Sequence, residues 1–199
     1  MKELYIIRHG ETEYNRLKLV QGSGIDSDLN ETGMAQARRF FHKFASEGFN
    51  KVYTSKLKRT HQSVQRFVDL GLPLQQLEGL NEMSWGTKEG RPTTDEDETH
   101  YGYVTTQWMN GNTALAFPEG ESPDEVAARM RPAIEHILAQ PGEEKVLICM
   151  HGRALRVLLC LLLHYPLTCM EGFEHRNLCL YKLRQAGTRF YIETGNYIA

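Results

Sequence analysis

The chain has 199 residues, of which 41% are hydrophobic and 24% charged, and its formal net charge is −2. This length and composition fit one globular domain. The nearly balanced charge offers no basic surface for nucleic acid or for an acidic membrane, so any phosphate chemistry must come from a local cluster of basic residues. The longest apolar run, Val157 to Leu163, is too short to cross a bilayer. We therefore expect neither nucleic acid nor a membrane among the partners.

The N-terminus and the cysteines favour a cytoplasmic location. Met1-Lys2-Glu3 leads directly into an apolar stretch and shows no signal-peptide pattern. The cysteines lie singly in apolar segments, without the CxxC spacing of a zinc site or a redox pair. Buried thiols are therefore the better interpretation of Cys149, Cys160, Cys169 and Cys179.

Strands and helices are expected to alternate in the first half of the chain. The apolar, β-prone run Leu4 to Ile7 predicts a buried strand that ends at Arg8-His9-Gly10. After a loop rich in turn formers, Asn30 can cap a helix over residues 31–46, and a short strand over residues 51–55 is followed at once by another helix. This order is typical of a mostly parallel sheet covered by helices on both faces.

The second half of the chain is expected to hold an insertion, a helix, a strand, a further helix and a final hairpin. Residues 74–80 can form a third strand, and residues 145–150 give the clearest buried strand of the sequence. Helices are predicted from Glu121 or Ser122 and over residues 154–163, and a hairpin over residues 178–194. The expected fold is an α/β three-layer sandwich with a mostly parallel central sheet flanked by helices. It forms a single domain over residues 1–199, with a small helical cap insertion at about 90–118 that carries an acidic run and several aromatics.

Polar side chains follow the expected strands at their carboxyl ends, where an open α/β sheet binds its ligands. Arg8 and His9 follow the first strand, Arg59 the second, and His151 the strand over residues 145–150, with Glu82 on a further connection. Two arginines and two histidines suit a compact dianion, and phosphate fits best. A neutral imidazole can attack phosphorus, the other basic groups can hold the charge of the transferring group, and Glu82 can protonate the leaving alkoxide.

Two other classes of site use some of these residues. A metallohydrolase could bind a metal through His9, His151 and Glu82, but the two arginines would repel the cation and the strand ends carry no aspartates. A non-catalytic phosphate-binding module would need the arginines but would have no use for Glu82 or paired histidines. Turnover of phosphate, as opposed to binding alone, distinguishes an enzyme from such a module.

Four blocks, in order along the chain, resemble the histidine phosphatase superfamily in its phosphoglycerate mutase-like branch. They are the signature Arg8 to Asn15, the segment Ser55 to Ser63, the segment Leu80-Asn81-Glu82 with Gly86 and Glu89-Gly90, and His151-Gly152 with Arg156. Pro118 to Ser122 also resembles the family's approach to its penultimate helix. The chain departs from the family at Ser27-Asp28-Leu29-Asn30, where a Ser-Pro-Leu-Thr type of segment is usual.

The resemblance implies a role for each matched residue. His9 would be the phosphorylated nucleophile and Glu82 the proton donor, while Arg8, Arg59 and His151 would bind the phosphoryl group. Three further residues would line the substrate loop, namely Asn15, Gln21 and Gly22. No metal and no organic cofactor is implied, and the partner would be a small phosphorylated metabolite.

The remaining histidines match no catalytic position and are expected at the surface or in the core: His42, His61, His100, His136, His164 and His175. Arg156 is expected to support packing. Tyr101, Tyr103 and Trp108 are expected in the core of the cap, which is also where specificity for a bulky organic group would be set.

Relatives with this kind of site either hydrolyse phosphomonoesters or move phosphate within phosphoglycerate. The glycolytic mutases are generally longer, with more cap sequence and a C-terminal tail, and the short cap here has few basic residues to retain a doubly phosphorylated intermediate. We therefore expect a phosphatase with a phosphohistidine intermediate. A cofactor-dependent phosphoglycerate mutase and an α-ribazole phosphate phosphatase stay open as alternatives, and the sequence leaves the natural substrate and the oligomeric state undetermined.

Overall fold

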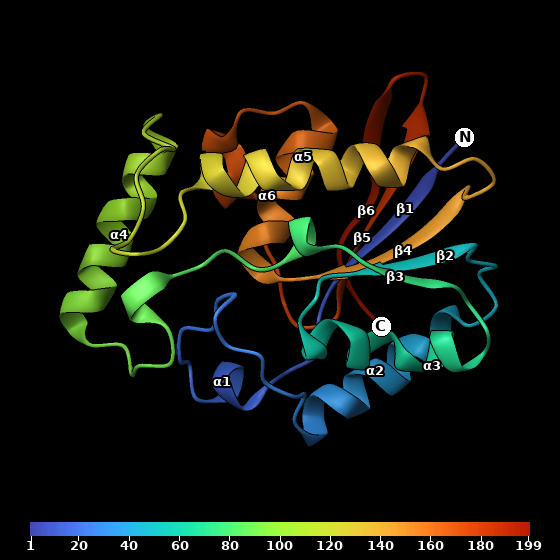
Figure 1. Cartoon of the computed structure of the whole chain (residues 1–199), viewed down its shortest axis with the longest axis horizontal. Coiled ribbons are helices and arrows are strands. Elements are labelled where there is room, and N and C mark those ends of the chain that lie inside the picture. Colours follow the sequence, from blue (N-terminus) through green and yellow to red (C-terminus); the bar gives the residue numbers. More distant parts are fainter.

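The computed structural model describes all 199 residues and contains one six-stranded sheet in the order β3-β2-β4-β1-β5-β6 (Figure 1). The strands are β1 (Glu3–Arg8), β2 (Lys51–Thr54), β3 (Leu74–Gln76), β4 (Lys145–Met150), β5 (Cys179–Ala186) and β6 (Arg189–Ile198). The first four strands pair in parallel, and β5 and β6 are antiparallel to their neighbours. The predicted α/β fold is confirmed.

Helices cover both faces of this sheet (Figure 1). One face carries α2 (Glu31–Phe44) and α3 (Lys58–Asp69), and the other carries α5 (Pro123–Ala139) and α6 (Gly152–Leu163). Because side chains alternate along a strand, Tyr5 and Ile7 of β1 pack with the first pair of helices, and Leu4 and Ile6 pack with the second. Such strands must be apolar on both faces, as the sequence of β1 is.

Local signals fix where the helices begin. The Ser122 hydroxyl accepts a hydrogen bond from the Glu125 backbone N–H, the Glu125 carboxylate accepts one from the Ser122 N–H, and Pro123 occupies the first turn. At the start of α2, the Asn30 side chain accepts from Gly33 N–H at 2.9 Å.

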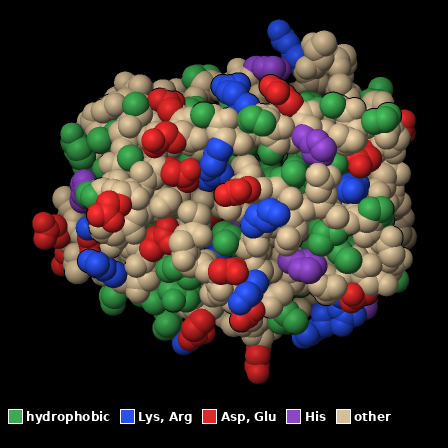
Figure 2. Space-filling model, viewed as in Figure 1, with side chains coloured by type: hydrophobic (Ala, Val, Ile, Leu, Met, Phe, Trp, Pro, Cys, Tyr) green, Lys and Arg blue, Asp and Glu red, His purple; other side chains and the backbone are tan.

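Helix α4 (Asp95–Met109) lies apart from the three layers, at the left of Figure 1. Thr94 and Asp97 form its capping box. Trp108 is fully buried, with its ring centroid 6.4 Å from that of Trp85 and 6.4 Å from that of Phe117. Acidic side chains gather over α4 in Figure 2, while elsewhere on that face Lys and Arg are interspersed with Asp and Glu.

Several boundaries differ from those expected. β3 is only three residues long because the chain turns into a 3₁₀ helix, Glu78–Leu80, that packs on α5. α6 begins at Gly152, and β6 continues to Ile198. Cys169 is exposed, so the expectation that all four thiols are buried was wrong for this one. No helix combines the length and the apolar character needed to span a membrane.

Candidate active site

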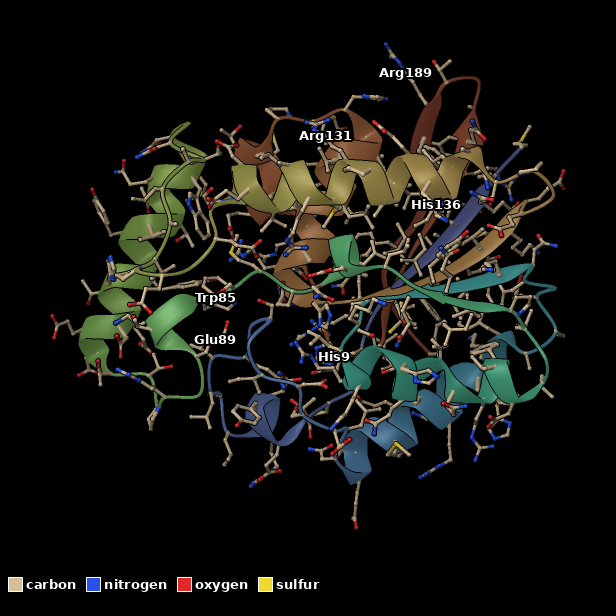
Figure 3. All side chains as sticks on the ribbon, viewed as in Figure 1. His9, Trp85, Glu89, Arg131, His136 and Arg189 are labelled. Carbon is tan, nitrogen blue, oxygen red and sulfur yellow. The ribbon has the colours of Figure 1, made fainter.

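The sheet topology brings the two predicted site histidines together. β1 and β4 are parallel neighbours, with Arg8 opposite Met150, so the residues that follow them meet at one edge of the sheet. His9 N–H donates to Met150 O at 3.0 Å, and the ring centroids of His9 and His151 lie 5.2 Å apart. In Figure 3, His9 lies at the end of the sheet, on the side that faces Trp85 and Glu89.

The protonation state of His9 follows from its hydrogen bond. Nδ1 lies 2.7 Å from the Gly10 carbonyl oxygen, which can only accept, so Nδ1 carries the proton and Nε2 holds the free lone pair. Burial, and then the charges of Arg59 and Arg8, lower the pKa of His9 well below its usual value. His9 is therefore a neutral, oriented imidazole, which is the form a nucleophile requires.

Hydrogen bonds to α3 fix the loop that carries His9. Gly10 N–H donates to Ser63 Oγ at 2.9 Å, and Ser63 Oγ donates to Arg59 O at 2.7 Å, so α3 holds the His9 loop directly. A Cβ atom on Gly10 would lie 2.7 Å from Gly33 O, which is closer than a side chain tolerates. Glycine at this position lets the loop pack on the first turn of α2.

Arg59 and His151 form a buried pair below the sheet edge. Arg59 Nε donates to His151 Nδ1 at 3.2 Å, and His151 Nε2 lies 2.8 Å from Ser55 Oγ. Because a guanidinium only donates, Nδ1 of His151 accepts and its Nε2 carries the proton. Burial first, and then the charge of Arg59, lower the pKa of His151 well below its usual value, and burial lowers that of Arg59 to about 10.

Arg8 contacts a histidine that the sequence analysis had placed outside the site. Its Nη1 lies 3.3 Å from Nδ1 of His175, which precedes β5. Burial and then the charges of Arg8, Arg156 and Arg153 lower the pKa of His175 to about 3. His175 thus lies in the site as a neutral ring, and the expectation of a surface or core role was wrong for this residue.

Glu82 is held at the N-terminus of α6. Its Oε1 accepts from Met83 N–H and Ala154 N–H, both at 2.9 Å, and its Oε2 accepts from Arg153 N–H at 3.1 Å. Two of these donors are free backbone groups in the first turn of a helix, where carboxylates bind well. Arg129 supports the same loop from α5, donating to Glu82 O at 2.9 Å.

The three residues expected to line the substrate loop lie in different environments. Asn15 accepts from Asn177 Nδ2 at 3.0 Å, and Gln21 accepts from Thr12 Oγ1 at 2.8 Å. Asn15 and Gln21 line a cavity at this edge of the sheet, whereas Gly22 does not. The Gly22 carbonyl instead accepts from Arg59 Nη2 at 3.1 Å, so its place in the structure is to hold the arginine.

A cavity of about 970 Å³ opens in front of these groups. Arg8, Glu82, Gly152 and His175 form part of its lining. His9, Arg59 and His151 lie beneath it, only 3%, 0% and 0% exposed, and are absent from its lining. Their contacts with a substrate remain predictions.

The outer part of the cavity combines aromatic rings with charges of both signs. Trp85, Tyr101 and Phe117 contribute the rings, and Lys88, which is ion-paired with Asp97, lies on the cavity wall with Arg91. Arg153 is buried among the rings of Trp85, Tyr101 and Trp108 and pairs with Glu171. Tyr103 is largely exposed and Trp108 lies in the core, so Tyr101 is the only one of the three predicted cap aromatics that reaches the cavity.

The residues of the metallohydrolase alternative do not form a ligand set. No group of three or more His, Cys, Asp or Glu side chains in the structure is arranged to hold a metal ion. Both oxygens of Glu82 accept hydrogen bonds from backbone N–H groups. The arrangement instead suits an anion with a neutral nucleophile beside it.

A family model described as the histidine phosphatase superfamily (branch 1) matches residues 4–197. The chain belongs to this superfamily. The resemblance predicted from its four sequence blocks is confirmed. Among the chain's relatives and structural neighbours are proteins named as phosphatases or mutases.

Some of the relatives are named as mutases and others as phosphatases. The chain is 34% identical over 185 residues to the probable phosphoglycerate mutase GpmB of Yersinia pestis (strain Pestoides F), covering 90% of this chain and 83% of that protein. The alpha-ribazole phosphatase of Shigella flexneri is 25% identical, with a TM-score of 0.83 and coverage of 98% and 96%. A mycobacterial glucosyl-3-phosphoglycerate phosphatase, 24% identical with a TM-score of 0.87 over 98% of this chain and 99% of its own, shares the fold.

Residues outside the sequence blocks complete the candidate site. His175, Asn177 and Arg153 reach it from α6 and from the connection before β5. Asn177 Nδ2 donates to His9 O at 3.1 Å. The positions of His175 and Asn177 depend on the antiparallel pairing of β5 with β1, which no local sequence pattern reports. Arg153 was the most accessible to sequence reasoning, since it follows His151-Gly152 directly.

Proposed function

We propose that this histidine phosphatase hydrolyses phosphomonoesters through a covalent phosphohistidine at His9. The observation that carries the proposal is the neutral His9 ring, whose Nε2 lone pair is unused and whose Nδ1 is fixed by Gly10. Nε2 attacks phosphorus, an N–P bond forms, and the P–O bond to the leaving group breaks. Glu82 takes up a proton as the substrate binds, on an oxygen lone pair that its three N–H contacts leave free, and gives this proton to the leaving alkoxide. The resulting carboxylate then activates water, which attacks phosphorus and releases phosphate from His9.

The charged groups around His9 support the transfer step. Arg8, Arg59 and His151 would bind the equatorial oxygens of the phosphoryl group, where charge must be held. For His151 to donate from Nδ1, its proton must move from Nε2 to Nδ1, and Nε2 must accept from the Ser55 hydroxyl, 2.8 Å away. The Arg59 Nε–H, which donates to Nδ1 at 3.2 Å, must then turn from the ring toward the phosphoryl group. Asn15 and Gln21 would contact the substrate from the cavity wall, and Gly22 would act through its bond to Arg59.

The cavity favours a phosphatase acting on a metabolite with a sizeable organic group. Phosphoglycerate would fill a small part of about 970 Å³, whereas the rings of Trp85, Tyr101 and Phe117 offer apolar contact for a larger group. We propose that residues 90–118, which include α4, act as a cap on one domain spanning residues 1–199, and that the protein works in the cytoplasm.

Phosphoglycerate mutase is the second candidate, and the 34% identity to a probable phosphoglycerate mutase supports it. A mutase must retain a doubly phosphorylated intermediate. Of the cations near the outer cavity, Lys88 pairs with Asp97, Arg153 shares Glu171 with Arg156, and Arg91 has no ion-pair partner. So few free cations favour hydrolysis over retention of a second phosphoryl group. Alpha-ribazole phosphate is the specific substrate case that the Shigella flexneri structure suggests.

Phosphate release from a panel of esters tests the proposal. The panel holds 3-phosphoglycerate, sugar phosphates, α-ribazole phosphate and an aryl phosphate, each assayed with a chelator present, alongside formation of 2-phosphoglycerate. We expect metal-independent release that is abolished in His9→Ala. Isomerisation faster than release would make the protein a mutase, and binding of phosphate without turnover would make it a binding module.

A further inference from the structure

His175 lies on the inner wall of the cavity, on the connection between the 3₁₀ helix Leu167–Gly172 and β5. Its ring covers Gly152, the first residue of α6. A Cβ atom on Gly152 would lie 2.7 Å from Cε1 of His175 and 3.1 Å from each ring nitrogen. The absence of a side chain at Gly152 therefore makes room for the histidine ring beside Arg8.

The contact between Arg8 and His175 fixes the tautomer of the histidine. Nη1 of Arg8 has no lone pair, so at 3.3 Å it must donate to Nδ1 of His175, and the ring proton lies on Nε2. Arg59 donates to Nδ1 of His151 in the same way, at 3.2 Å. Each arginine of the site is thus paired with the lone pair of a neutral histidine.

Nothing else holds the Arg8 guanidinium in place. Its Nε is buried without a hydrogen-bond partner, and the bond to His175 is the only one that its side chain makes. No carboxylate forms an ion pair with it. Arg59, in contrast, also donates to the carbonyl oxygens of Ile25 and Gly22. The orientation of Arg8 therefore depends on one acceptor.

We infer that His175 is a positioning residue for the phosphoryl-binding site, holding the Arg8 guanidinium by accepting its Nη1–H so that the remaining N–H groups face the bound phosphate. The inference rests on the proposed function, in which Arg8 binds the phosphoryl group. A neutral acceptor orients the arginine without cancelling its charge, which a carboxylate partner would do. Preorganised donors lose less freedom on binding than mobile ones.

Two substitutions with side chains of the same branched shape separate this role from packing. His175→Asn keeps an acceptor close to the position of Nδ1, while His175→Leu fills the space without one. Binding of inorganic phosphate is measured by calorimetry, with thermal melting as the control for folding. We expect the leucine variant to bind phosphate about tenfold more weakly and the asparagine variant within about threefold of wild type. In an Arg8→Ala background, His175→Leu should change phosphate binding little, since the group that it positions is gone.

Three results would overturn the inference. These are wild-type affinity in His175→Leu, equal losses in both variants, and an undiminished loss in the Arg8→Ala background. Aryl phosphate turnover separates this claim from the proposed function. If wild type binds phosphate but hydrolyses no ester, the phosphatase proposal fails. The phosphate affinities of the variants still test whether His175 positions Arg8. If wild type binds no phosphate, both fail.

Discussion

Replacing Glu82 with glutamine separates its chemical role from its structural one. The glutamine carbonyl can take the place of Oε1 and keep the bonds from Met83 N–H and Ala154 N–H, each 2.9 Å long in the wild type. The amide NH₂ then faces Arg153 N–H, so one donor near the cavity loses its acceptor. We expect a loss of about 1–3 kcal/mol in the free energy of unfolding, toward the lower end because water can reach the cavity wall.

The catalytic effect should depend on the leaving group. A general acid contributes about 10²- to 10⁴-fold to the rate, and glutamine cannot donate a proton in this way. For an alkyl phosphate, whose alkoxide needs that proton, kcat/KM should fall by about 10²- to 10⁴-fold. For p-nitrophenyl phosphate, whose phenolate leaves unprotonated, the fall should be less than about tenfold.

Steady-state kinetics on both esters, with unfolding by urea as the structural control, measure the two effects separately. Equal losses on the two esters would refute the assignment of Glu82 as the proton donor. They would indicate instead that the carboxylate acts through its bonds to the first turn of α6.

Three further predictions concern pH, the His9 loop and the core around α4. Because the pKa of His175 is lowered to about 3, the unfolded chain binds a proton there below about pH 6.5 while the folded chain does not, so stability falls on acidification. Between pH 7 and pH 5, His175→Asn should lose about 2 kcal/mol less unfolding free energy than wild type, with urea unfolding at each pH as the measurement. Ser63→Ala leaves the buried Gly10 N–H without its acceptor, so the free energy of unfolding should fall by about 1–3 kcal/mol and the activity should also fall. Unchanged kinetics would show that this bond does not position His9. Trp108→Ala should cost about 3–5 kcal/mol, against at most about 0.5 for the exposed Tyr103→Ala, and similar melting temperatures for the two would contradict the burial of Trp108.

The fold was predictable because its strongest signals are local. The strands β1 and β4 are apolar, and polar residues follow each of them directly. This pattern predicts a parallel sheet and the edge at which its ligands bind. The caps of α2 and α5 stand in the sequence as Asn30 and as Ser122-Pro123. The short β3 was harder to predict, since whether residues 77–80 extend the strand depends on packing against α5.

The site was only partly predictable. The sequence brings Arg8, His9, Arg59 and His151 to one edge, but it does not report which of them reach the cavity and which lie beneath it. His175 could not be found by motif, because its contact with Arg8 spans 167 positions and forms only when β5 pairs with β1. Nor does the sequence report that Glu82 caps α6, a contact between positions 72 residues apart.

The central claim is a covalent phosphohistidine at His9, and trapping that species tests it most directly. The wild-type protein is mixed with p-nitrophenyl phosphate, quenched in alkali, digested and analysed by mass spectrometry, with His9→Ala as the control. The account predicts a phosphoryl group on the peptide that contains His9, formed within one turnover and absent from the variant. Full turnover by the variant, or by wild type with no phosphorylated His9 at any time, would contradict it.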